Sequence, residues 1–105
     1  MRQWVKRRIE WTQEAQTDIG LLQASGNADL AAAAKAAMES YATTGAAHPH
    51  FVAYFEFGKW RGIWRLKQIG QRGGFRVLFE DYSARRLIIV NRVRLRADAY
   101  DDPPG

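Results

Sequence analysis

Arginine and lysine side chains dominate the second half of the chain. Between residues 59 and 96 there are eleven basic residues and two acidic ones, a formal charge of +9, whereas the whole 105-residue chain carries +5. A concentrated basic region is typical of proteins that bind nucleic acid, because each cation can replace a counterion at a phosphate. The same charge also fits a solvated surface or a contact with an acidic protein. The pattern therefore indicates a polyanionic partner without identifying it.

The alternation of side chains along the expected strands places several of these charges on one face. In residues 63–67, Trp64 and Leu66 point to one side and the basic residues point to the other; residues 75–79 alternate in the same way. Neighbouring cations on one face repel each other by about 1–4 kcal/mol per close pair before salt screening, and an anionic ligand relieves that repulsion. The pattern predicts a basic groove made by Arg65, Lys67, Arg76 and either Arg92 or Arg94.

Other residue types that support catalysis are scarce. The chain has no cysteine, which excludes disulfides, thiolate metal sites and cysteine nucleophiles. Its two histidines, His48 and His50, flank Pro49 in an expected loop. They leave a histidine-pair ribonuclease open as an alternative, but two imidazoles without a nearby carboxylate or thiolate make a poor metal site. We expect no metal and no small-molecule cofactor.

The first half of the chain predicts a strand followed by two helices. Residues 5–11 combine β-branched and aromatic residues and predict a short strand. Thr12 is placed to cap a helix that ends near Ser25, and Asn27 to cap an alanine-rich helix that closes at Gly45. Two helices joined by a tight turn form a hairpin, which needs a flat apolar surface to cover.

The second half predicts that surface. Strand patterns occupy residues 62–69, 74–81 and 86–93, and the connections at 71–74 and 81–85 are short enough for an antiparallel meander. Residues 51–57 fit either an extra strand or an aromatic loop. We expect a single domain over residues 1–100 and a frayed tail over 101–105. No apolar run is long enough to span a bilayer, so we expect a cytoplasmic protein without membrane contact.

The order of these elements resembles the RelE/ParE superfamily, the toxins of bacterial toxin–antitoxin pairs. The likeness covers nearly the whole chain and rests on five short motifs: Ile9–Ala15, Gly62–Lys67, Gly74–Phe79, Leu87–Val90 and Arg94–Tyr100. It implies an α+β fold, with an N-terminal strand and a helical hairpin packed on one face of a small twisted antiparallel β-sheet. It also implies a cognate antitoxin protein that covers the basic surface.

The RelE branch of this superfamily cleaves messenger RNA on the ribosome. Matched position by position, the resemblance implies the catalytic residues Arg65, Lys67, Arg76, Arg94 and Tyr100. We expect the RNA-binding surface around them to include Arg61, Arg72, Arg92, Arg96 and Trp64. Arg65 departs from the pattern, which has a lysine there, and a guanidinium does not give up its proton in proteins.

Cleavage of RNA by its own 2′-hydroxyl needs a base, stabilisation of charge on the phosphorane and an acid at the leaving oxygen. A phenol with the ordinary pKa of about 10 is a poor base at neutral pH, but neighbouring cations lower that pKa. Tyr100 is therefore the candidate base, with Arg76 and Arg94 on the phosphate and Lys67 able to exchange a proton. Two alternatives stay open: a ParE-like inhibitor of DNA gyrase that needs no catalytic tyrosine, and a non-toxic relative that acts as a binding module.

Overall fold

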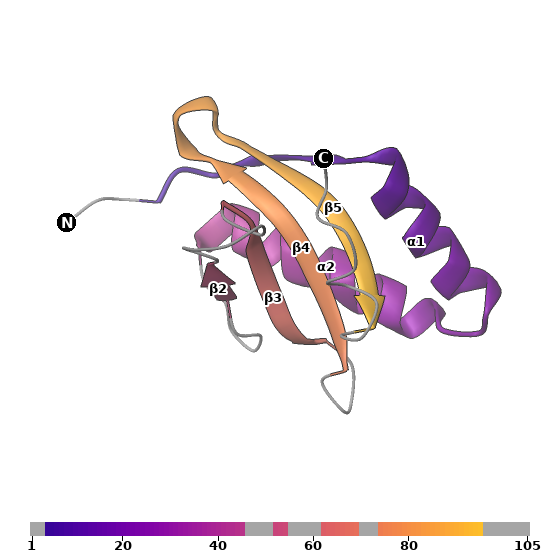
Figure 1. The fold of residues 1–105 in the computed structure, drawn as a ribbon. Helices are drawn as coiled ribbons and strands as arrows, with labels where there is room; N and C mark the ends of the chain where they lie inside the picture. Colours follow the sequence, from indigo (N-terminus) through magenta and orange to yellow (C-terminus); the bar gives the residue numbers. More distant parts are fainter. Residues whose placement is uncertain (1–3, 46–51, 55–61, 70–73, 96–105) are drawn as a thin grey trace.

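The computed structural model describes residues 4–45, 52–54, 62–69 and 74–95. These residues form one five-stranded sheet and two α-helices (Figure 1). In chain order the elements are β1 (Arg8–Trp11), α1 (Gln13–Ala24), α2 (Ala28–Thr44), β2 (Val52–Tyr54), β3 (Trp64–Ile69), β4 (Phe75–Tyr82), a short 3₁₀ turn (Ser83–Arg85) and β5 (Leu87–Leu95). No described helix is long and apolar enough to cross a membrane.

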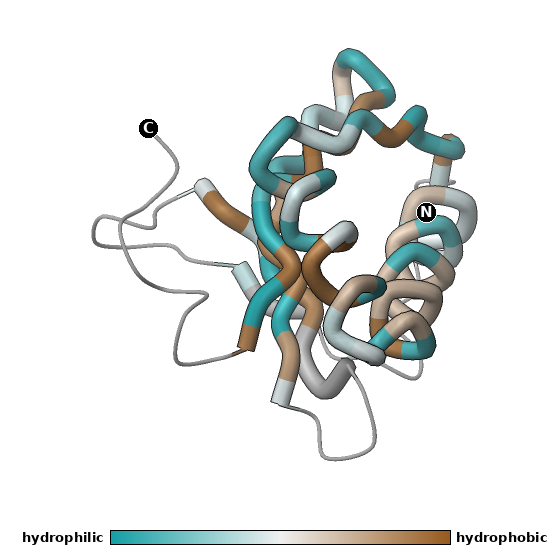
Figure 2. Tube along the Cα trace, turned by 90° about the vertical axis from the view of Figure 1, so that its right-hand side faces the viewer, coloured by the Kyte–Doolittle hydropathy of each residue, from teal (hydrophilic) through white to brown (hydrophobic). Residues whose placement is uncertain are grey.

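The sheet has the strand order β1-β5-β4-β3-β2. Both helices lie on one side of it, so that the molecule has a helical layer and a sheet layer (Figure 2). This confirms the predicted α+β fold. Strands β2 to β5 are antiparallel, but the expectation of a wholly antiparallel sheet is wrong for β1, which pairs in parallel with β5. No tight turn joins these two strands, and therefore no turn imposes the antiparallel direction on them.

The ends of the helices follow the predicted caps with one exception. The Oγ1 of Thr12 accepts a hydrogen bond from the amide of Ala15 at 3.1 Å and starts α1, while Gly45 ends α2 with a φ of 72°. Asn27 stands at the start of α2, but its amide donates to Ser25 instead of capping the helix. Residues 51–57 contain a short strand, β2, and the first strand begins at Arg8 instead of residue 5.

The core lies between the helices and the covered face of the sheet. Phe79, Val77 and Val90 contribute fully buried side chains from β4 and β5, and Met38 packs against them from α2. Small residues such as Ala34 line the same side of α2 and let the helix approach the sheet closely. The residues predicted to alternate inward on β4 are thus the ones that pack.

A polar network fastens the segment before β1 to α2 and to the end of β4. The buried Arg7 donates from Nε to Asp81 at 3.1 Å, and the hydroxyl of Tyr41 donates to the other oxygen of Asp81 at 3.1 Å. The guanidinium of Arg7 also lies 3.7 Å from the centre of the Trp4 ring, whose Nε1 donates to the carbonyl of Ala42. Burial, and then the charge of Asp81, raise the pKa of Tyr41 above its ordinary value.

Candidate functional site

Four arginines of the central strands share the face of the sheet that the helices leave open. Arg76 on β4 pairs with Arg94 on β5, and Leu78 on β4 lies between Arg65 on β3 and Arg92 on β5. Residues paired across neighbouring strands point to the same side, so the strands do bring these arginines to one face, as predicted. Val77 and Phe79, which alternate with Arg76 and Leu78 along β4, point to the opposite side, which the helices cover.

Other predicted site residues are placed differently. Trp64 lies on the helix-covered side, where its ring packs against Tyr54 and Phe79 with centroid distances of 4.7 and 6.5 Å. It therefore does not share a face with the arginines. Lys67 belongs to β3, within the register irregularity between Leu66 and Ile69. The remaining predicted residues lie outside the described part of the chain: Arg61, Arg72, Arg96 and Tyr100, together with His48 and His50.

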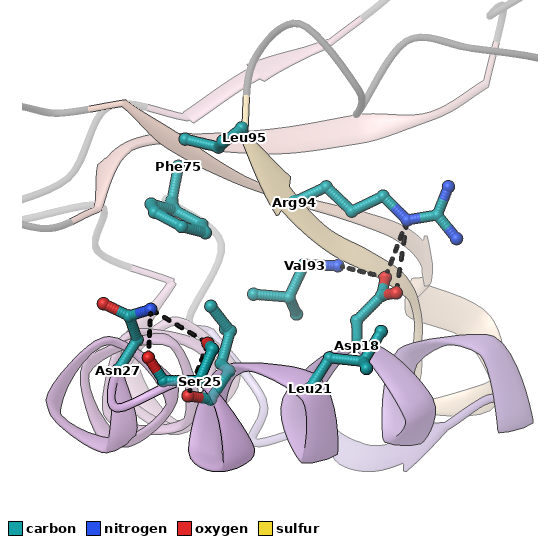
Figure 3. A pocket seen from close by; sticks show the side chains of 9 residues that line it. Asp18, Leu21, Ser25, Asn27, Phe75, Val93, Arg94 and Leu95 are labelled. Carbon is teal, nitrogen blue, oxygen red and sulfur yellow. Dashed lines mark hydrogen bonds and ion pairs between the residues drawn. The ribbon is translucent and has the colours of Figure 1, made fainter.

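Two carboxylates of α1 reach the arginines at the end of β5. The Oδ2 of Asp18 accepts the backbone N–H of Val93 at 3.1 Å and the Nε of Arg94 at 3.0 Å (Figure 3). The Oε1 of Glu14, one turn earlier, accepts the Nη2 of Arg94 at 2.8 Å and the Nε of Arg92 at 3.2 Å. The predicted basic groove is therefore partly neutralised from within the protein.

This cluster changes the accessibility and the charge of the arginines. Arg92 is only 6% exposed, while the side chain of Arg94 is 27% exposed and reaches solvent. Burial lowers the pKa of Arg94, but the hydrogen bond and charge of Asp18 and the charge of Glu14 outweigh it, and the net pKa is raised. Arg94 directly opposes Arg76, a like-charge pair that the two carboxylates make tolerable.

Glu14 and Asp18 are the site residues that sequence reasoning missed. Asp18 falls on the same stripe of α1 as Ala15, Ile19 and Leu22, all of which are buried. A carboxylate on a buried helical stripe signals a cationic partner, because an ionised carboxylate is almost never buried unless it is paired. The spacing of Glu14 and Asp18 places both on one side of the helix.

An open groove of about 610 Å³ lies beside this cluster, between the end of α1 and the ends of β4 and β5 (Figure 3). The side chains of Leu21 and Leu95 stand exposed at its rim, and Phe75 forms part of its wall. Asp18 and Arg94 line it as well. The groove is thus apolar with an ion pair along one side.

A further carboxylate, that of Glu80, lies on the same face as the arginines, nearer the turn between β4 and β5. Glu80 accepts the hydroxyl of Tyr82 at 2.9 Å and the amide of Asn91 at 3.3 Å. The hydrogen bond from Tyr82 to Glu80 is the main reason why the pKa of Tyr82 is raised. Glu80 therefore adds a negative charge to this face beyond those of Glu14 and Asp18. Within the described residues, no group of three His, Cys, Asp or Glu side chains could hold a metal ion.

The arrangement of two helices on one side of a mostly antiparallel sheet is shared with several solved structures. YafQ from E. coli has this fold with a TM-score of 0.68 and 12% sequence identity, over 91% of this chain and 100% of that chain. The E. coli DinJ-YafQ toxin–antitoxin complex matches with a TM-score of 0.63 and 12% identity, over 92% and 100% of the two chains.

A third solved structure, the toxin–antitoxin complex RelBE2 from Mycobacterium tuberculosis, matches with a TM-score of 0.61 and 17% identity, over 88% of this chain and 100% of that chain. No protein-family model and no curated sequence matches this chain. The identities are too low to say more than that the fold is shared, and at that level the resemblance seen in the sequence is confirmed.

Proposed function

We propose that this chain is the toxin of a toxin–antitoxin pair and cleaves messenger RNA on the ribosome, in the cytoplasm. The observation that carries the proposal is the placement of Arg65, Arg76 and Arg94 on three adjacent strands, on the face of the sheet opposite the helices. The fold shared with YafQ, a chain that has been crystallised in a toxin–antitoxin complex, supports the same class of protein.

The reaction is an attack of the RNA 2′-oxygen on the neighbouring phosphorus. The bond to the 5′-oxygen breaks, so the products are a 2′,3′-cyclic phosphate and a free 5′-hydroxyl. In our proposal Tyr100 accepts the proton of the 2′-hydroxyl, Lys67 supplies the proton of the leaving 5′-oxygen, and Arg76 and Arg94 stabilise the phosphorane. Arg65 adds positive charge but no proton, because its guanidinium stays protonated.

RNA on both sides of the cleaved bond would meet the basic residues around this site, which we propose to be Arg61, Arg72 and Arg96. Of the other two predicted RNA-binding residues, Arg92 is buried against Glu14 and Trp64 faces the helices, so we do not include them in this contact. The ribosome would hold the RNA in line for attack. Such positioning lowers the activation barrier by several kcal/mol, a contribution that this small protein then does not have to make itself. The proposed partner is an antitoxin protein whose acidic segment covers the arginines in the resting state.

The test is cleavage of a defined transcript in a ribosome-containing translation extract. We expect Arg76→Ala to slow cleavage by about 100-fold or more, as removal of a charge-stabilising donor does, and Tyr100→Phe by a similar factor, as removal of a general base does. Arg85→Ala, which removes an exposed arginine from the turn after β4, is the matched control and should cleave like the parent.

Three outcomes would contradict the proposal. Undiminished cleavage by Arg76→Ala and Tyr100→Phe would remove the proposed site. Trapped complexes of DNA gyrase on DNA, with transcripts intact, would identify a ParE-like inhibitor. Harmless expression of the parent chain in bacteria without any antitoxin would identify a non-toxic binding module.

A further inference from the structure

We infer that Glu14 and Asp18 of α1 are positioning residues for Arg94, which hold one edge of its guanidinium so that the other edge faces a phosphate. The inference rests on the proposed function, because it assigns Arg94 to the RNA. It extends that function to a helix on the covered side of the sheet, which contributes no residue to the predicted site.

Asp18 supplies a rigid anchor. Its side chain is 7% exposed, and one of its oxygens accepts both the backbone N–H of Val93 and the Nε of Arg94, while the other lies 3.2 Å from the same Nε. The carboxylate thus binds the backbone of β5 and the side chain of the next residue at once. The direction in which the Arg94 side chain leaves the strand is thereby fixed.

Glu14 completes the grip on the same edge. It accepts the Nη2 of Arg94 at 2.8 Å, so that the Nε and Nη2 side of the planar guanidinium faces α1. Among the described residues, no acceptor binds the Nη1 of Arg94. The end formed by Nη1 and the second hydrogen of Nη2 therefore points away from α1, and such a pair of donors suits two oxygens of one phosphate.

The charges of Glu14, Asp18 and their arginine partners favour a role in orienting Arg94 over a role in merely neutralising its charge. A surface designed only for affinity would leave all its arginines without internal carboxylates, since every added cation strengthens binding to RNA. Here Glu14 and Asp18 place two negative charges against Arg92 and Arg94 and yet leave the Arg94 side chain 27% exposed. The arrangement lowers electrostatic attraction and fixes a direction, which benefits the transition state more than the bound RNA.

The experiment separates the cleavage rate from RNA affinity. We would prepare Glu14→Gln and Asp18→Asn, which keep the size of each side chain and remove its charge. Glu10→Gln is the matched control, because Glu10 forms an exposed ion pair with Arg8 at 3.2 Å on β1. Single-turnover cleavage of ribosome-bound transcript and the Kd for a short single-stranded RNA would be measured for each folded variant.

We expect both α1 variants to cleave about 10- to 100-fold more slowly, the range typical of residues that orient a functional group. Their Kd for RNA should stay the same or become tighter, because the face gains a positive charge. Glu10→Gln should match the parent in rate. In an Arg94→Lys background, Glu14→Gln should cause no further loss, since a lysine has no second edge to direct.

Several results would overturn the inference. If Glu14→Gln cleaves as fast as the parent, Glu14 does not position Arg94; if it cleaves faster, the carboxylate masks the site instead. If Asp18→Asn unfolds, Glu14→Gln decides alone, because it leaves the Asp18 contact with β5 intact. Unaltered cleavage by Arg94→Lys would reject the proposed site itself, whereas a loss in Arg94→Lys without a loss in Glu14→Gln would reject only the positioning role.

Discussion

Replacing Asp81 by alanine should cost this chain a large part of its stability. Asp81 and Arg7 form an ion pair whose side chains are only 7% and 9% exposed, and the same carboxylate accepts the hydroxyl of Tyr41. The substitution leaves a buried guanidinium without its counter-ion and a buried hydroxyl without its acceptor. Removing one partner of a buried pair costs about 3–5 kcal/mol, compared with a typical total stability of about 5–15 kcal/mol.

Thermal and urea unfolding followed by circular dichroism would measure this cost. In a domain of this size, the loss corresponds to a fall in Tm of at least about 12 °C. Tyr41→Phe removes only the hydrogen bond to the charged Asp81 and should cost about 1.5–3 kcal/mol. Glu10→Gln breaks an exposed pair, with side chains 70% and 54% exposed, and should have almost no effect. An Asp81→Ala protein that melts within a few degrees of the parent would refute the claim that the network stabilises the fold.

Three further predictions concern the stability of the fold. Because the folded-state pKa of Tyr41 is raised, the stability that its neutral hydroxyl contributes is complete below pH 10 and is lost as the pH rises beyond it. The free energy of unfolding, measured from pH 9 to 11, should therefore fall less steeply with pH in Tyr41→Phe than in the parent. Gly45→Ala should lower the free energy of unfolding by about 2 kcal/mol or more, because φ is 72° and the new Cβ would meet the Trp4 ring at 2.5 Å. Gly20 lies inside α1, and a Cβ added there would have no atom within 4 Å, so Gly20→Ala should raise the free energy of unfolding by about 0.5–1 kcal/mol.

Local patterns were enough to predict most of the fold. The caps at Thr12 and Gly45, the apolar stripes of both helices and the alternation along β3 and β4 depend on neighbours a few residues away, and the structure confirms them. The position and direction of β1 depend on contacts with β5, nearly 80 residues later. No local pattern specifies such a pairing when a helical hairpin and three strands intervene.

In the candidate site, too, local patterns predicted some features, while contacts between residues far apart in the sequence could not be predicted. Strand alternation predicted that Arg65, Lys67 and Arg76 share one face with either Arg92 or Arg94, since it requires only the period of a strand. It could not show that Glu14 and Asp18 approach Arg94, because those ion pairs join residues 76 to 80 positions apart in the sequence. Asp18 on a buried helical stripe was the one local sign, and it indicated that a cation was needed without indicating which one.

A count of arginines therefore overstates the positive charge that this face offers to RNA. Arg92 is buried against Glu14, and Arg94 shares its charge with two carboxylates. For single-stranded RNA, the affinity falls with salt by a logarithmic slope of about 0.7 for each phosphate neutralised, so these two residues together should contribute less than two full contacts to that slope. Glu14→Gln should make the slope steeper and cleavage slower at the same time. A steeper slope with faster cleavage would mean that charge, and not the direction of Arg94, limits the reaction.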